Sequence, residues 1–246
     1  VSVVMAQMLR PFRMPYIPKK VNSKPMSSKS KTSFEPYLMS IALLIGLGAF
    51  VSKIIDYQFK MMAADTFPNQ NDLVSFFGTY YMSTGAATLI MQFFVTGFIL
   101  TRFGILTGLL VLPISLAIGS SGFLAIGTLS AVFIAKFSDQ VFKFSTDNAV
   151  REILWLPVAP EKKKRVKPII DGTIRSGLEG LAGVMIFALV SFKLVPQDNI
   201  QLLSLLVLLG VLFWLWNSFR LKDGYVNSLM KAIENRQLNL DDVEFD

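Results

Sequence analysis

The chain contains no cysteine and no histidine. The lack of cysteine excludes disulfides, thiol catalysis and cysteine-based zinc or iron–sulfur sites. The lack of histidine removes the most frequent general base and metal ligand. There is also no phosphate-cradling Gly-x-x-x-x-Gly-Lys loop, and no pair of acid/base carboxylates inside an apolar stretch. We therefore expect neither an enzyme nor a bound cofactor or metal.

Charged residues are scarce too, at 17% of 246 residues, whereas 52% are hydrophobic. A soluble domain of this length would carry more charge. The apolar residues form six stretches that are long enough, or nearly so, to cross a hydrocarbon core of about 30 Å. These stretches are residues 37–62, 73–100, 104–120, 122–145, 169–194 and 200–219. The sequence predicts an all-α membrane protein with six transmembrane helices, in contact with the lipid bilayer.

Short polar or glycine-containing segments separate these stretches. The segment Thr101–Gly104 divides the second stretch from the third, and Gly119–Gly122 divides the third from the fourth. Because the Gly119–Gly122 break is short, we expect a tight hairpin between the third and fourth helices.

The formal net charge of +7 first suggests a nucleic-acid ligand, but the positions of the cations favour a membrane topology. Lysines and arginines gather in alternate connections, and acidic residues lie in the opposite ones. By the positive-inside rule, both termini face the cytoplasm. We expect a multi-pass membrane protein that binds no nucleic acid.

Composition divides the chain into three parts. Residues 1–35 are polar and basic and read as a cytosolic linker or loop. Residues 36–222 hold the six-helix transmembrane domain. After Lys222 the chain turns polar, and Tyr225, Leu229 and Ile233 fall at helical spacing. Residues 223–246 therefore predict the start of a cytosolic helical region, and we expect the chain to be a fragment of a longer protein.

A motif of the form Lys-x-x-Asp-x-x-Phe-Lys occurs twice, in residues 53–60 and 136–143. One copy lies near the end of the first predicted helix and the other near the end of the fourth. A unit of three spans inverts its direction across the membrane when it is repeated. The repeat therefore predicts a three-plus-three inverted repeat, which is half of a fold of the major facilitator type.

Charged residues inside predicted spans are rare and costly. Within the first copy, Lys53 and Lys60 stand three and four residues from Asp56, at favourable pairing distances. Asp139 stands in the same relation to Lys136 and Lys143. Each copy has one positive charge in excess, so a cavity lined by both would favour an anionic solute. The alternative is that these side chains only brace the helix bundle.

The basic segment at residues 145–177 resembles the nucleotide transporter family, the ATP/ADP translocases of intracellular bacteria and plastids. The residues that stand in matching order are Arg151, Glu152, Trp155, Pro157, Lys167, Asp171, Arg175 and Gly177. Arg151 replaces a usual lysine and Trp155 a usual tyrosine. The family's leading aspartate falls on Asn148, with Asp147 one position earlier.

This resemblance implies the C-terminal six-helix half of a carrier, similar to bacterial members that are fused to HEAT-type repeats. It also implies a location in a bacterial inner (plasma) membrane. It implies a second six-helix half as partner, and an anionic solute, a nucleotide such as ATP or ADP, moved by alternating access. The candidate binding or gating residues are Lys53, Asp56, Lys60, Lys136, Asp139, Lys143, Arg151, Glu152, Lys167 and Asp171. For the last four, a loop brace is an equal alternative. The alternative function is a non-transporting membrane anchor or scaffold for a cytosolic helical-repeat domain or a larger membrane complex.

Overall fold

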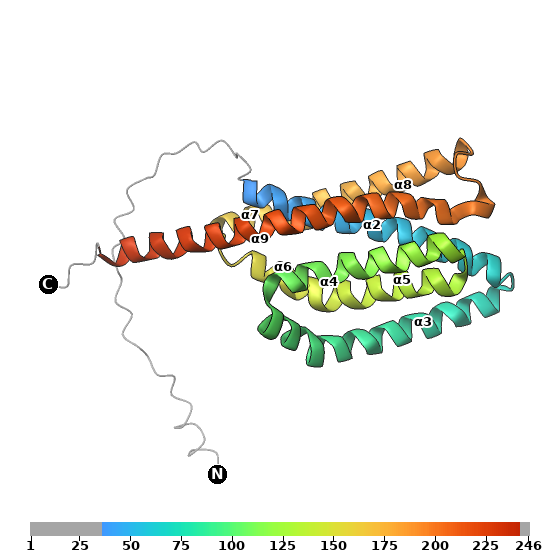
Figure 1. The fold of residues 1–246 in the computed structure, drawn as a ribbon, viewed down its shortest axis with the longest axis horizontal. Coiled ribbons are helices and arrows are strands. Elements are labelled where there is room, and N and C mark those ends of the chain that lie inside the picture. Colours follow the sequence, from blue (N-terminus) through green and yellow to red (C-terminus); the bar gives the residue numbers. More distant parts are fainter. Residues whose placement is uncertain (1–35, 242–246) are drawn as a thin grey trace, which may run out of the picture. The chain divides into compact units, whose positions relative to one another are not determined.

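In the computed structural model, residues 36–241 are described, except for the side chains of residues 197, 198, 231–233 and 235–241. The predicted linker and the last five residues lie outside this range. The described part of the chain consists of helices joined by short connections, with no strand (Figure 1). The α-helices are α2 (Pro36–Thr66), α3 (Gln70–Ile90), α4 (Gly97–Ile126), α5 (Leu129–Phe142), α6 (Asn148–Leu154), α7 (Pro160–Pro168), α8 (Arg175–Ser191) and α9 (Ser204–Asp241). Between them lie π-helical turns η1 (Met91–Thr96), η2 (Lys143–Asp147) and η3 (Ile169–Ile174), and the 3₁₀ segment η4 (Gln197–Leu203).

Four helical stretches are long and apolar enough to cross a membrane: Pro36–Thr66, Gln70–Ile126, Pro160–Ser191 and Asn199–Met230. The expectation of an all-α membrane protein holds at this level. The stretch Gln70–Ile126 contains a reversal, because Gly104 has a non-helical backbone with φ of 78°. This is the break predicted at Thr101–Gly104. The helical run of α5, η2 and α6 is not among the four stretches, and it carries charged side chains along its length.

The prediction of a hairpin at Gly119–Gly122 is wrong, because these residues lie inside α4. The turn comes later, at Gly127, whose φ of 68° caps α4 in the left-handed conformation. Gly119 serves a different purpose. A Cβ atom on Gly119 would lie 2.7 Å from the Cα of Ala135, so the missing side chain lets α4 and α5 approach closely.

The last helix, α9, continues through Lys222 to Asp241. The predicted boundary between the membrane domain and a polar C-terminal region therefore falls within one uninterrupted helix. Its early part is apolar, and it packs against α2 and α4.

Helix α2 holds the described bundle together. It packs against α5, α8 and α9, and most of its side chains are buried. Tyr37, in its first turn, donates a hydrogen bond of 2.5 Å from Oη to the carbonyl oxygen of Leu154. Small residues allow close crossings, as at Gly48, where a Cβ would lie 2.9 Å from the ring of Trp214. These contacts bring α2 and α5 side by side.

Candidate functional site

The two copies of the repeated motif lie against each other, one on α2 and one on α5. Lys136 and Asp139 of α5 are buried, with exposed fractions of 6% and 1%. On α2, Ser52 is buried and Asp56 is partly buried. Buried charges are costly unless they are paired, so their partners decide what this region can do.

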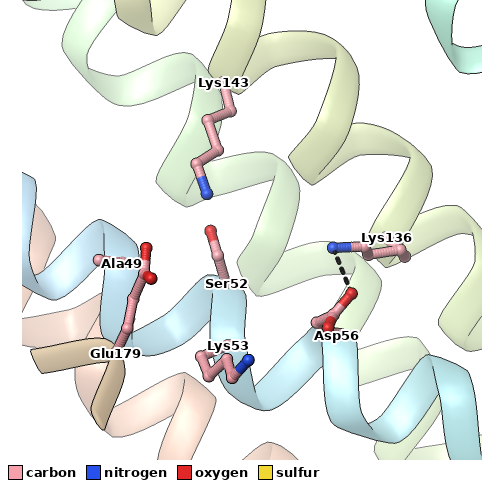
Figure 2. A pocket seen from close by; sticks show the side chains of 7 residues that line it. All are labelled: Ala49, Ser52, Lys53, Asp56, Lys136, Lys143 and Glu179. Atoms are coloured by element: carbon pink, nitrogen blue, oxygen red, sulfur yellow. Dashed lines mark ion pairs between the residues drawn. The ribbon is translucent and has the colours of Figure 1, made fainter. Parts of the chain in front are cut away.

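Lys136 joins the two copies. Its Nζ lies 3.0 Å from Asp56 Oδ1 on α2 (Figure 2). It also lies 3.5 Å from Asp139 Oδ2 on its own helix. Ser52 Oγ donates a hydrogen bond of 2.6 Å to Asp139 Oδ1. Asp56 also pairs with Lys60 at 2.7 Å. Each aspartate thus has a partner on the opposite helix.

Two pairings expected from spacing are not formed in the described residues. Lys53 does not pair with Asp56, and Lys143 does not pair with Asp139. The physical reason is that both aspartates turn toward the interface between α2 and α5, where Lys136 and Ser52 satisfy them. Lys53 remains exposed, and Lys143 remains partly buried without an ion pair in the part of the chain that the structure describes.

A small cavity of about 130 Å³ lies at this junction. It is lined by Ala49, Ser52, Lys53, Asp56, Lys136, Lys143 and Glu179 (Figure 2). Figure 2 shows the Lys143 side chain extending toward Ser52. Glu179 pairs with Arg175 at 3.1 Å, the helix brace typical of residues four apart. After these pairings, Lys53 and Lys143 are the uncompensated cations of the lining. The cavity can therefore attract an anionic group.

The charges of α5 continue along the same helical run into α6. Lys136, Asp139, Lys143, Asp147 and Arg151 alternate in sign at intervals of three or four residues. Arg151 Nη2 lies 2.6 Å from Asp147 Oδ2, an ion pair between residues four apart. Both side chains are largely shielded from solvent. Asp147, Ser52 and Glu179 are not among the site residues predicted from sequence, although the alternation of sign was a usable signal for Asp147.

The other site residues predicted in the basic segment, Glu152, Lys167 and Asp171, lie on α6, α7 and η3. Glu152 accepts a hydrogen bond from Lys167 and lies 3.6 Å from Lys163 Nζ, which ties α6 to α7. The hydrogen bond from Lys167 lowers the pKa of Glu152. Asp171 is exposed on η3. The structure therefore pairs Glu152 with Lys167, whereas no ion pair joins Arg151 or Asp171 to either of them among the described residues.

Comparison of the sequence with known proteins places the chain in a family. The sequence profile of the TLC ATP/ADP transporter family matches residues 12–141, just over half of the chain. The matched range includes the first copy of the motif and the second copy up to Val141. The basic segment at residues 145–177 lies outside it.

Relatives of known function are carriers. The ADP,ATP carrier protein 1 of Chlamydia trachomatis is 27% identical over an alignment of 156 residues. The alignment covers 55% of this chain and 30% of that protein. The carrier protein of the same name from Chlamydia muridarum is 26% identical over the same shares. The chain thus matches about a third of the length of these relatives. No solved structure matches it. The profile match shows that the chain belongs to the TLC ATP/ADP transporter family.

Proposed function

We propose that this chain is part of a membrane carrier that moves an anionic nucleotide such as ATP or ADP. The observation that carries the proposal is the cavity between the two motif copies, into which Lys143 extends without a carboxylate partner among the described residues. Family membership and the names of the relatives support the nucleotide. The cavity is too small for a whole nucleotide, so it would receive one phosphate group of the solute.

The charges divide between two roles in this proposal. Lys143 and Lys53 would meet phosphate oxygens as point charges. Lys136, neutralised by Asp56 and Asp139, would hold α2 against α5 rather than bind solute. Glu152 and Lys167 would brace the connection between α6 and α7.

Uptake of labelled ATP into vesicles that contain the full-length protein tests the proposal. We expect Lys143→Gln to lower uptake at least tenfold while the purified variant keeps its melting temperature. Lys222→Gln is the matched control, because Lys222 is also a lysine but is exposed on α9. A well-folded wild-type protein that neither binds nor moves any nucleotide would reject the carrier and favour the membrane anchor or scaffold.

We also propose that transport proceeds by alternating access against a second six-helix half, with this chain as an inverted repeat of the major facilitator type. The match to about a third of the relatives' length leaves room for that half. In such repeats the two units exchange roles between the two conformations. Under this repeat, Asp56 corresponds to Asp139 and Lys53 to Lys136.

The structure is asymmetric between the two copies. The Lys136–Asp56 pair is formed, but its counterpart, Lys53–Asp139, is replaced by the Ser52–Asp139 hydrogen bond. We propose that the opposite state forms Lys53–Asp139 and opens Lys136–Asp56. Double-mutant cycles distinguish the pairs. Asp56 and Lys136 should couple in stability, whereas Lys53 and Asp139 should couple in transport rate only. Independent effects of Lys53 and Asp139 on transport would rule out the exchange.

The remaining assignments follow from the same proposal. Residues 1–35 would form a cytosolic linker, residues 36–222 the six spans, and residues 223–246 the start of a cytosolic helical region such as HEAT-type repeats. Both termini would face the cytoplasm of a bacterium, with the protein in its inner (plasma) membrane. Accessibility of single cysteines to an impermeant reagent tests this orientation, since the chain has no native cysteine.

A further inference from the structure

Helix α7 is the most cationic element of the described chain. It carries Lys162, Lys163, Lys164, Arg165 and Lys167 within one short segment. Only Val166 of this helix is buried. Lys163 and Lys167 are drawn to Glu152, but Lys164 and Arg165 are exposed and form no ion pair with any residue that the structure describes. A positive surplus therefore remains at the surface of α7.

One face of this helix forms a groove of about 590 Å³. Its lining residues are Pro160, Lys163, Lys164, Lys167, Pro168 and Asp171. They recur at intervals of three or four, so they share one helix face. Proline rings and the methylene stems of the lysines supply apolar lining. The ammonium groups of Lys163 and Lys167 are drawn to Glu152, which leaves Lys164 to meet a ligand. With three lysines against Asp171, the lining is largely apolar and carries a net positive charge.

The groove adjoins a surface suited to hydrocarbon. Through η3, α7 leads into α8, which belongs to a membrane-spanning stretch with only 11% of its most apolar window buried inside the protein. Helix α8 exposes Leu181, Val184 and Phe187, and Ile169 is exposed beside the groove. A cationic helix at the end of such a span lies at the level of lipid headgroups.

From this arrangement we propose that the α7 groove binds the headgroup of an anionic phospholipid. The phosphate meets Lys164, and an acyl chain follows the exposed apolar side chains of α8. A soluble phosphate or nucleotide would use the same lysine but would leave the apolar lining and the α8 surface unused. This site is separate from the cavity between α2 and α5, so it does not depend on the proposed transport.

Lipid retention by the full-length protein tests the proposal. The protein is purified from nanodiscs that contain equal amounts of phosphatidylglycerol and phosphatidylcholine, and the retained lipids are quantified. We expect enrichment of phosphatidylglycerol, reduced about fivefold by Lys164→Gln, as the loss of one surface cation predicts. Lys164 forms no ion pair with the described residues, so its loss should not impair folding.

Lys222→Gln serves as the matched control. It removes the same charge from the same end of the bundle. Gly224, two residues after Lys222, lies against Tyr37, and Tyr37 donates a hydrogen bond to Leu154 at the end of α6. Its phosphatidylglycerol retention should equal that of the wild type. Equal retention of both lipids, or an equal loss in both variants, would refute a specific site. Displacement of the lipid by excess inorganic phosphate would identify a site for soluble anions and would also overturn the proposal.

Discussion

Lys136 is the residue on which the buried network depends. It is the shared partner of Asp56 on α2 and Asp139 on α5. Its loss would leave buried Asp139 with Ser52 as its hydrogen-bond partner and with no ion pair among the described residues. Removing one partner of a buried ion pair typically costs about 3–5 kcal/mol.

We therefore expect Lys136→Gln to lower the melting temperature of the detergent-solubilised protein clearly. Lys60→Gln removes a cation from the same aspartate, but Lys60 is about half exposed, so its effect should stay below about 1 kcal/mol. Similar melting temperatures for the two variants would show that the buried network does not stabilise the bundle.

Glu152 provides a test by pH outside the membrane-spanning stretches. Its pKa is lowered by the hydrogen bond from Lys167, so the contact contributes stability above the pKa of the unfolded chain. That contribution is lost as the pH falls through the lowered pKa of the folded state. Because Glu152 is exposed, the effect should be small.

The link between α6 and α7 should loosen first in acid. Protease cleavage between Trp155 and Pro160, followed over falling pH, measures this. Glu152→Gln should already show the acid level of cleavage at neutral pH. A wild-type profile that stays flat to strongly acidic pH would contradict the role of this contact.

At the scale of elements, the crossing of α4 and α5 depends on the missing side chain of Gly119. A Cβ there would lie 2.7 Å from the Cα of Ala135, and backbone cannot yield as a flexible side chain can. We expect Gly119→Ala to separate the two helices and to destabilise the protein by about 1–3 kcal/mol.

Gly122 offers a matched control in the same helix, because a Cβ there would meet nothing within 4 Å. Gly122→Ala should leave the melting temperature unchanged or raise it slightly, since alanine favours helix. If both substitutions lowered the melting temperature equally, close approach at Gly119 would not be the cause.

Gly119 and Gly127 show where prediction from sequence succeeded and where it failed. Long apolar runs located most helices, since the run length depends only on local composition. The hairpin between α4 and α5 was misplaced because a glycine at a helix crossing and a glycine at a turn look alike in one dimension. Gly127, with its positive φ, makes the turn. Which role each takes depends on Ala135, a residue of the next helix.

The candidate site was also only partly predictable. The repeated motif identified Lys136, Asp139, Asp56 and Lys143, because charges in apolar runs are conspicuous. The ion pairs between the two helices could not be predicted, because spacing within one helix says nothing of the helix that packs against it. Ser52 was invisible as a partner of Asp139, since a serine in a span has no distinctive signal.

For the whole molecule, the buried ions of α5 bear on how the protein is made. A charged residue at the centre of a lone helix costs about 2.5–3.5 kcal/mol on insertion into a membrane. Helix α5 carries two, Lys136 and Asp139. On α2 they meet the counter-charge Asp56 and the hydrogen-bond donor Ser52. Helix α2 precedes α5 in the chain, so Asp56 and Ser52 are synthesised before α5 leaves the ribosome.

Biosynthesis should therefore be ordered, with α5 entering the bilayer only beside α2. In a glycosylation-based insertion assay of the growing chain, Asp56→Ala should reduce integration of α5, while Asp65→Ala, beyond the motif on the same helix, should not. The ion pairs that stabilise the finished protein would then also act as a checkpoint during its synthesis. A chain that lacks the earlier helix would be held back at the membrane and left to quality control.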